Sequence, residues 1–463
     1  MKHRGPLHFT YAESFHCIGS ACEDTCCQGW KVAVDRESFV RLQSLSESPL
    51  HTLISTSLER LPQTEDGSEP ASFAVFRMAE GNRCPMLTED RLCRIQREHG
   101  AALLPHTCAT YPRMVRTLDG VTETGLTLSC PEAARLVLLD EDLLAKRDGE
   151  PFNSHANHDE DCPAAPTHSP AHSPVHSSRI AVRDSILRLV GNRNYPLWQR
   201  LFLIGVLCRR LDAAGPHADS ADESGASTRA ILAGFEATVD TRALHGTMDA
   251  LPANNQIQLD AVLRLAGLML HRSNVSPRFV QCVHAFTTGI GNGPGATLES
   301  LAGHYADAHR RWFAPFFDIN PQILENLLVN SILSLGFPFA KARDAAQPPK
   351  SMARQFAVLA AQFALIRGLL VGVAGHQRNR FCVDHVVHTV QAASKHFEHH
   401  PEFAGQVESL LAESRLDDAG GLTILLNEPA SGRAVDQIPS EIRKSPEGLP
   451  AEIKPELAVA PQN

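Results

Sequence analysis

Apolar residues recur at helical spacing along most of the second half of the chain. In IAVRDSILRLVGN, Ile180, Ile186, Leu187 and Val190 fall at spacings suited to one helical face. PLWQRLFLIGVLCRRLDAA carries a second stripe and begins at a proline, which is favoured in the first turn of a helix. The same pattern recurs in NNQIQLDAVLRLAGLMLHR, PQILENLLVNSILSLGF, MARQFAVLAAQFALIRGLLVGVA and VDHVVHTVQAASKHFEHH. Because β-rich runs do not alternate with these segments, the pattern predicts a mainly α fold without a doubly wound sheet.

Polar segments divide the chain into four parts. Residues 1–147 are expected to form a cysteine-rich, metal- or cluster-binding domain, and residues 179–426 a helical domain. Residues 148–178 between them are rich in Pro, Ser and His and have almost no large apolar side chain, which predicts a disordered linker. A polar loop is expected at Gly215 to Thr228, and the Pro- and charge-rich tail, 427–463, is expected to be disordered.

Composition narrows the class of protein. The net charge of −9 argues against nonspecific nucleic-acid binding, which requires a basic surface. We find no run of about 18 apolar residues, so we expect no transmembrane helix and no membrane partner. The N-terminus has basic residues but no apolar core of a signal peptide. We therefore expect a cytoplasmic protein, in which thiols bind metals more often than they form disulfides.

Eight of the twelve cysteines lie within the first 130 residues. Several thiolates brought to one point can bind a soft cation or an iron–sulfur cluster. In a helix Cys22 and Cys26 would share a face, and a turn after Cys84 would bring Cys93 back towards it. Zinc and a [4Fe–4S] cluster both accept four cysteines, so the spacing decides neither the metal nor the ligands. The candidate metal ligands are Cys17, Cys22, Cys26, Cys27, Cys84, Cys93, Cys108 and Cys130.

The same segments carry a resemblance to a known family. FHCIGSACEDTCCQGWKVAVD, CPMLTEDRLCRIQREHGAALLPHTCATYPR and GLTLSCPEAARLVL resemble the flagellin lysine-N-methylases. The cysteine-rich part of that family is similar to small zinc- or iron-chelating proteins with clustered cysteines. The helical segments follow in the order that the family shows, so the resemblance covers residues 10 to 410 approximately.

The resemblance implies methyl transfer from S-adenosylmethionine to lysine ε-amines of flagellin, with an iron–sulfur cluster in the cysteine-rich part. A Rossmann-type cofactor loop is not evident, because the glycine-rich segment Gly289 to Gly295 follows a helical pattern. S-adenosylmethionine would then be chelated by the open iron of a [4Fe–4S] cluster with three cysteine ligands. Arg113 in TYPR is a candidate to bind the cofactor carboxylate. Radical and polar transfer both remain open.

Polar transfer requires that the lysine amine first lose a proton. Glu23, Asp24 and Tyr111 are the nearest proton acceptors to the cysteines in sequence, although each is favoured as a cap or hydrogen-bonding group.

Other polar residues are interpreted as structural. Arg367 and the pair Glu325–Asn326 are expected to form a polar network between helices, and HFEHHP, at His396 to Pro401, is interpreted as a solvated helix end. The alternative to an enzyme is a noncatalytic zinc-binding module that presents the helical domain to a partner.

Overall fold

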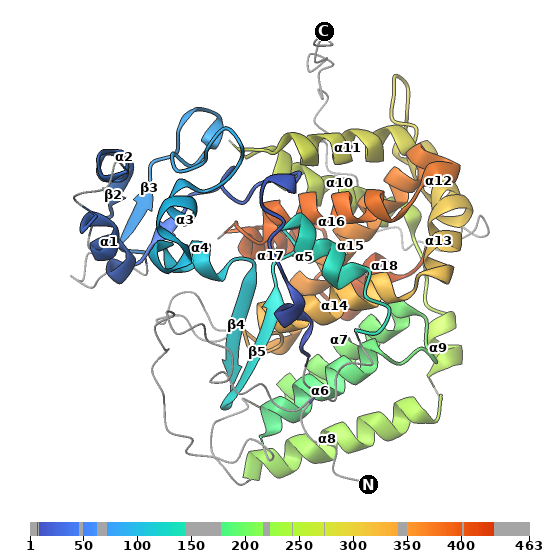
Figure 1. The fold of residues 1–463 in the computed structure, drawn as a ribbon. Helices are drawn as coiled ribbons and strands as arrows, with labels where there is room; N and C mark the ends of the chain where they lie inside the picture. Colours follow the sequence, from blue (N-terminus) through green and yellow to red (C-terminus); the bar gives the residue numbers. More distant parts are fainter. Residues whose placement is uncertain are drawn as a thin grey trace.

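The computed structural model describes residues 7, 9–45, 50–62, 72–143, 177–215, 223–242, 244–272, 274–340, 350–400 and 402–429. Helices dominate this part of the chain, as the apolar pattern predicts (Figure 1). Nearly all of the predicted linker and most of the predicted tail lie outside the described residues, so those two predictions remain untested.

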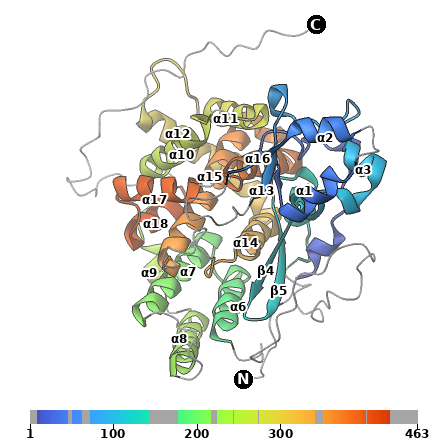
Figure 2. The same ribbon diagram turned by 90° about the vertical axis from the view of Figure 1, so that its left-hand side faces the viewer.

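A small lobe, defined here as the described residues between 26 and 110, lies to one side of the helices (Figures 1 and 2). Its strands form a three-stranded antiparallel sheet in the order β1-β3-β2, with Val34 opposite Ala74 and Glu59 opposite Val75. The lobe has a hydrophobic core of its own around Leu42, Ile54 and Phe76. Its elements are β1 (Ala33–Val34), α1 (Arg36–Gln43), α2 (His51–Ser57), β2 (Leu58–Arg60), β3 (Ala74–Phe76), α3 (Arg94–His99) and α4 (His106–Thr110).

A β-hairpin follows the small lobe and lies against the helices. Strands β4 (Arg113–Leu118) and β5 (Val121–Leu126) pair from Arg113↔Leu126 to Leu118↔Val121. Asp119 and Gly120 form the two-residue turn, with φ of 48° and 83°, as a type I′ turn requires. Helix α5 (Pro131–Leu138) comes next, with Cys130 at its N-cap.

Asn330 of helix α14 (Gln322–Leu335) fixes the hairpin to the helical part. Its side chain accepts from the Leu126 N–H at 2.9 Å and donates to the Leu126 carbonyl at 2.7 Å. It also accepts from the Tyr11 hydroxyl at 2.7 Å. Gly125 is required here, because a Cβ would lie 2.7 Å from the backbone nitrogen of Ser334. The N-terminal segment, the hairpin and α5 therefore belong to the same hydrophobic core as the helices.

The helical part is built around α15 (Met352–Gln377) (Figure 2). This helix packs against α7 (Leu197–Ala213), α10 (Asn255–Leu270), α11 (Pro277–Gly289) and α16 (Val383–Phe397). Among the described residues, Met352–Arg380 is the one segment long and apolar enough to cross a membrane, and 94% of its most apolar window is buried within the fold. The remaining helices of this part are α6 (Ser178–Val190), α8 (Glu223–Asp240), α9 (His245–Asp249), α12 (Leu298–Ala308), α13 (Ala314–Ile319), α17 (Phe403–Glu413) and α18 (Ala419–Leu426). A π-helical turn, His309–Phe313, joins α12 to α13.

Two sequence-based boundaries need correction. The loop expected at Gly215 to Thr228 is shorter, since α8 begins at Glu223. The helical part also extends beyond residue 426, because the Asn427 carbonyl accepts a hydrogen bond from buried Gln258 at 2.8 Å.

Candidate functional site

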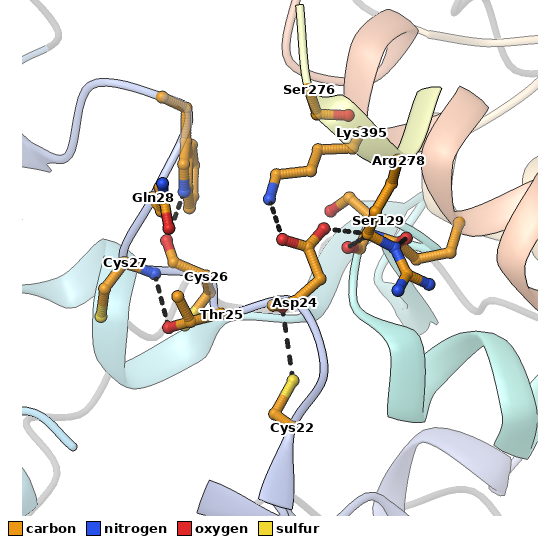
Figure 3. Close-up of polar contacts among 12 residues, drawn as sticks. Cys22, Asp24, Thr25, Cys26, Cys27, Gln28, Ser129, Ser276, Arg278 and Lys395 are labelled. Atoms are coloured by element: carbon orange, nitrogen blue, oxygen red, sulfur yellow. Dashed lines mark hydrogen bonds and ion pairs between the residues drawn. The ribbon is translucent and has the colours of Figure 1, made fainter. Parts of the chain in front are cut away.

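The first cysteine run is not helical, in contrast to the geometry considered from its spacing. A short 3-10 turn, Gly19–Ala21, leads into Cys22, and the chain then bends through Asp24 and Thr25 (Figure 3). The Cys22 thiol donates to the Asp24 carbonyl at 3.3 Å. Gly19 has a φ of 57°, a conformation incompatible with a continuing α-helix.

Four cysteines from separate segments meet at the core of the small lobe. We call Cys27, Cys84, Cys93 and Cys108 the four-thiol group. Cys84 is buried in that core and the other three pack against it. The Cys84 N–H donates to the Cys27 carbonyl at 2.8 Å, and Leu87 pairs with Cys93 in an isolated bridge that closes the predicted turn. Burial raises the pKa of Cys108, and the thiols of the other three raise it further, which shows their proximity.

Cys17, Cys22 and Cys130 form a second set, which we call the three-thiol group. Burial, together with the nearby thiols of Cys22 and Cys17, raises the pKa of Cys130 to about 12. Cys130 occupies the N-cap of α5. This group therefore lies where the cysteine run meets the helical part.

Cys26 lies between the two groups and is exposed. Its thiol interacts with Cys27 and Cys108 of the four-thiol group and with Cys17 of the three-thiol group. A hydrogen bond from Cys26 lowers the pKa of Cys27 to about 7, so Cys27 is the more acidic thiol of this adjacent pair.

Among the described residues, no three His, Cys, Asp or Glu side chains lie close enough together to bind one metal ion. The structure thus brings seven of the eight cysteines into two groups, with Cys26 between them, and their role as metal ligands stays a prediction.

Asp24 fastens the cysteine run to α16 (Figure 3). Its carboxylate accepts from Lys395 Nζ at 2.7 Å and from Gln391 Nε2 at 2.7 Å. Gln391 also donates to the Ser129 carbonyl at 2.8 Å and accepts from Arg278 Nε at 3.0 Å. The Asp24 and Lys395 side chains are only 15% and 11% exposed, so this ion pair is largely shielded from water.

A chain of polar and aromatic side chains continues from this contact. The Tyr111 hydroxyl lies 3.0 Å from Ser129 Oγ, which lies 2.8 Å from His399 Nε2. The Trp30 ring lies against His399, with ring centroids 4.4 Å apart, and its indole N–H donates to the Cys26 carbonyl. These side chains connect His399, just after α16, with the first cysteine run through Trp30, and with Ser129, the residue before Cys130.

Glu398 and His399 correct the interpretation of residues 396–400 as a solvated helix end, while Pro401 lies outside the described residues. Burial raises the pKa of Glu398 to about 7, although its carboxylate accepts hydrogen bonds from the Thr127 hydroxyl and the Leu128 N–H. Burial lowers the pKa of His399 to about 4. His396 is also buried, and its ring accepts from the Ser276 N–H at 3.1 Å. The polar composition of this segment reflects partners in other segments rather than exposure to water.

The other predicted site residues have structural partners. The Arg113 guanidinium donates to the Phe15 carbonyl at 3.0 Å and lies over the Phe15 ring. Its proposed role in cofactor binding stays a prediction. Glu23 pairs with Arg135 of α5. The glycine-rich segment between Gly289 and Gly295 connects α11 to α12 and is not preceded by a strand.

The expected polar network between helices is confirmed. Glu325 accepts from Arg193 and Arg200, at 2.7 Å and 2.6 Å. Asn326 donates to the carbonyls of Val137 and Asp140, which ties α14 to α5. On α15, buried Arg367 donates to two backbone carbonyls at the end of α18.

Known proteins similar to this chain fall in one family. Residues 183–425 match the family model of the FliB lysine N-methylase C-terminal domain, which is more than half of the chain. The chain belongs to the FliB lysine N-methylase family. This confirms the resemblance seen in the sequence, and the matched residues contain α16 and the residues Glu398 and His399 that follow it.

Individual relatives extend the match towards the N-terminus. The chain is 24% identical to the Lysine-N-methylase of Salmonella typhimurium over 401 residues, which is 85% of this chain and 92% of that protein. The Lysine-N-methylase of Salmonella choleraesuis matches with the same values. The Flagellar biosynthetic protein FliU of Salmonella muenchen is 33% identical over 148 residues, 32% of this chain and 84% of that protein. No solved structure matches the chain.

Proposed function

We propose that this protein methylates lysine ε-amines of flagellin in the cytoplasm, with S-adenosylmethionine as the methyl donor and a cysteine-bound iron–sulfur centre. Family membership supports lysine methylation, since two relatives carry the name Lysine-N-methylase. The name of a third relative refers to flagella, which supports flagellin as the substrate. The net charge of −9 suits a partner that presents lysines.

The observation that carries the proposal is the junction between the cysteines and α16. There the three-thiol group, the Asp24 contact and Glu398 lie within one continuous set of contacts. A site for methyl transfer needs a place for the donor and a proton acceptor for the amine, and this junction offers groups of both kinds.

The thiol groups fit an iron–sulfur centre in their donor chemistry. Four thiolates, or three thiolates and an open iron, are established ligand sets for such clusters. A cluster is larger than a single ion, so its thiolate ligands do not need to converge on one point. When bound, a cluster with an open iron would chelate the amino and carboxylate groups of S-adenosylmethionine.

The residues of the chain itself are suited to prepare the amine. A lysine ammonium has a pKa of about 10.4, so it must give up a proton before polar methyl transfer. Glu398, with a pKa raised by burial to about 7, can accept that proton near neutral pH. Ser129 and His399 form a polar path beside it, and Asp24 keeps the cysteine run against the same helix.

The test combines metal analysis with a methylation assay on purified, anaerobically prepared protein. We expect iron and acid-labile sulfide in the protein and methylated lysines in flagellin by mass spectrometry. Cys22→Ser should abolish methylation, whereas Cys282→Ala, in the buried core of the helical part, should leave it intact. A colourless protein that contains zinc and does not methylate flagellin would instead support a noncatalytic zinc-binding module.

A further inference from the structure

The cysteines divide into two groups that differ in number and location. In the four-thiol group every member interacts with the other three. In the three-thiol group, Gln391 holds the segments together, because its amide donates both to Asp24, whose carbonyl accepts from the Cys22 thiol, and to the carbonyl of Ser129, the residue before Cys130. Each of its three thiols also interacts with the other two. The first group lies in the core of the small lobe, whereas the second borders α5 and, through Asp24, α16.

The small lobe has little regular structure to stabilise it. Its longest helix, α1, has 8 residues and α4 has 5, while β1 has 2 and β3 has 3. Elements this short are not stable alone, and small cores generally need a disulfide or a metal. All cysteines described in the lobe are free thiols. The four-thiol group lies where a metal would supply the missing stabilisation.

The segments that carry these four cysteines strengthen this argument. Cys27 precedes β1, Cys84 and Cys93 flank a turn, and Cys108 lies in α4. A centre bound to all four would join three segments that are far apart in the sequence and would hold them around one core. Four thiolates also complete the coordination of either zinc or a [4Fe–4S] cluster, so such a centre is closed to substrate.

The three-thiol group, by contrast, would form a centre that is open to substrate. Three thiolates leave one coordination position free, which is typical of catalytic metal sites. Residues beside this group contact the segment that contains Glu398, the proton acceptor in the proposed function: Asp24 pairs with Lys395, and Leu128 donates its N–H to Glu398.

We propose that the N-terminal cysteines form two separate metal centres. One is a closed tetrathiolate centre at Cys27, Cys84, Cys93 and Cys108, which stabilises the small lobe. The other is an open centre at the three-thiol group, which faces the junction; only this second assignment rests on the proposed function. Binding a metal there would draw the four thiols closer together than they lie in the described residues. Tetrathiolate ligation is common to zinc and to a [4Fe–4S] cluster, and the metal analysis below distinguishes them.

The experiment compares Cys93→Ser, Cys22→Ser and the control Cys282→Ala in the full-length, anaerobically purified protein. Iron, zinc and sulfide are measured per chain, and melting temperature is followed by circular dichroism. Cys93→Ser should lose the closed centre and melt at a lower temperature. If that centre is zinc, zinc should disappear and iron stay unchanged; if it is a cluster, iron and sulfide should fall to half. Cys22→Ser should lose only the metal of the open centre and should keep that of the closed centre. Loss of the same metal in full from both variants would overturn the proposal.

A second measurement covers the case in which Cys93→Ser does not fold. The wild-type protein is treated with increasing chelator and alkylated with iodoacetamide, and each cysteine is followed by mass spectrometry. Two centres predict that the four-thiol and three-thiol cysteines become reactive at different chelator concentrations. Simultaneous exposure of all seven would indicate a single centre and contradict the proposal. Neither experiment measures methyl transfer, so neither result depends on the proposed function. If two centres are found but the separate methylation assay shows no methylation of flagellin, the proposed function is rejected and the two centres stand.

Discussion

Glu398 allows a quantitative test of the junction. Burial raises its pKa from 4.5 to about 7, so the folded protein binds the proton more tightly than the unfolded chain does. The stability that this proton contributes is therefore fully present below pH 4.5 and is lost as the pH rises through 7. Glu398→Gln is neutral at every pH and lacks this dependence.

The magnitude follows from the size of the shift. At about 1.4 kcal/mol for each pKa unit, the difference between 4.5 and about 7 corresponds to at most about 3.5 kcal/mol. The residue is partly exposed, and water screens some of this energy. Nearby histidines titrate in the wild type and in Glu398→Gln alike. Their contributions to the pH dependence of the free energy of unfolding therefore cancel when the two proteins are compared.

The assay is urea unfolding of wild type and Glu398→Gln at intervals from about pH 5 to about pH 8, across the range in which the carboxyl titrates. The free energy of unfolding of the wild type, minus that of the variant, should fall by about 2 to 3 kcal/mol over this range. Glu402→Gln, at an exposed glutamate nearby, is the matched control and should give a constant difference. A constant or rising difference for Glu398→Gln would refute the reasoning.

Three further predictions concern the contacts around the site. Asp24→Asn should retain the metal but slow methyl transfer, because the cysteine run loses its ion pair with α16. Metal analysis and the methylation assay check this, and loss of the metal or an unchanged rate would contradict it. Glu325→Gln should lower the free energy of unfolding by about 3 kcal/mol or more, since it leaves a buried arginine without its carboxylate, whereas Arg264→Ala, which breaks an exposed pair, should cost about 0.5 kcal/mol or less in the same urea assay. Gly291→Ala should cost about 1 kcal/mol or more, because Gly291 has a φ of 75° and a Cβ would lie 2.6 Å from His304, while Gly293→Ala should cost little. Neither glycine variant should weaken S-adenosylmethionine binding, measured by calorimetry on the folded proteins.

The long helices were predictable because each buries a continuous stripe of apolar residues. The strands of the small lobe were not, since two or three residues cannot show an alternating pattern. The hairpin did leave a signal that the sequence analysis missed, namely Asp119-Gly120 between two alternating runs.

The candidate site was predictable only in part. The abundance of thiols pointed to the correct region, but their division into groups depends on contacts between distant segments. Glu398 and His399 lie in a polar sequence that resembles a helix end in water. Contacts with Thr127, Leu128 and Trp30 bury them. Because these residues are far away in the sequence, the local pattern cannot predict the contacts.

The N-terminal segment and the hairpin share one core with the helices, which gives the small lobe the topology of an inserted domain. The chain enters the helical core at Tyr11, leaves it to build the lobe and returns at the hairpin held by Asn330. A lobe anchored at both ends cannot drift from the helices as a domain on a single tether would. A single cut between α5 and α6 would accordingly yield two polypeptides that stay associated as one particle, comparable to a split protein whose halves complement each other.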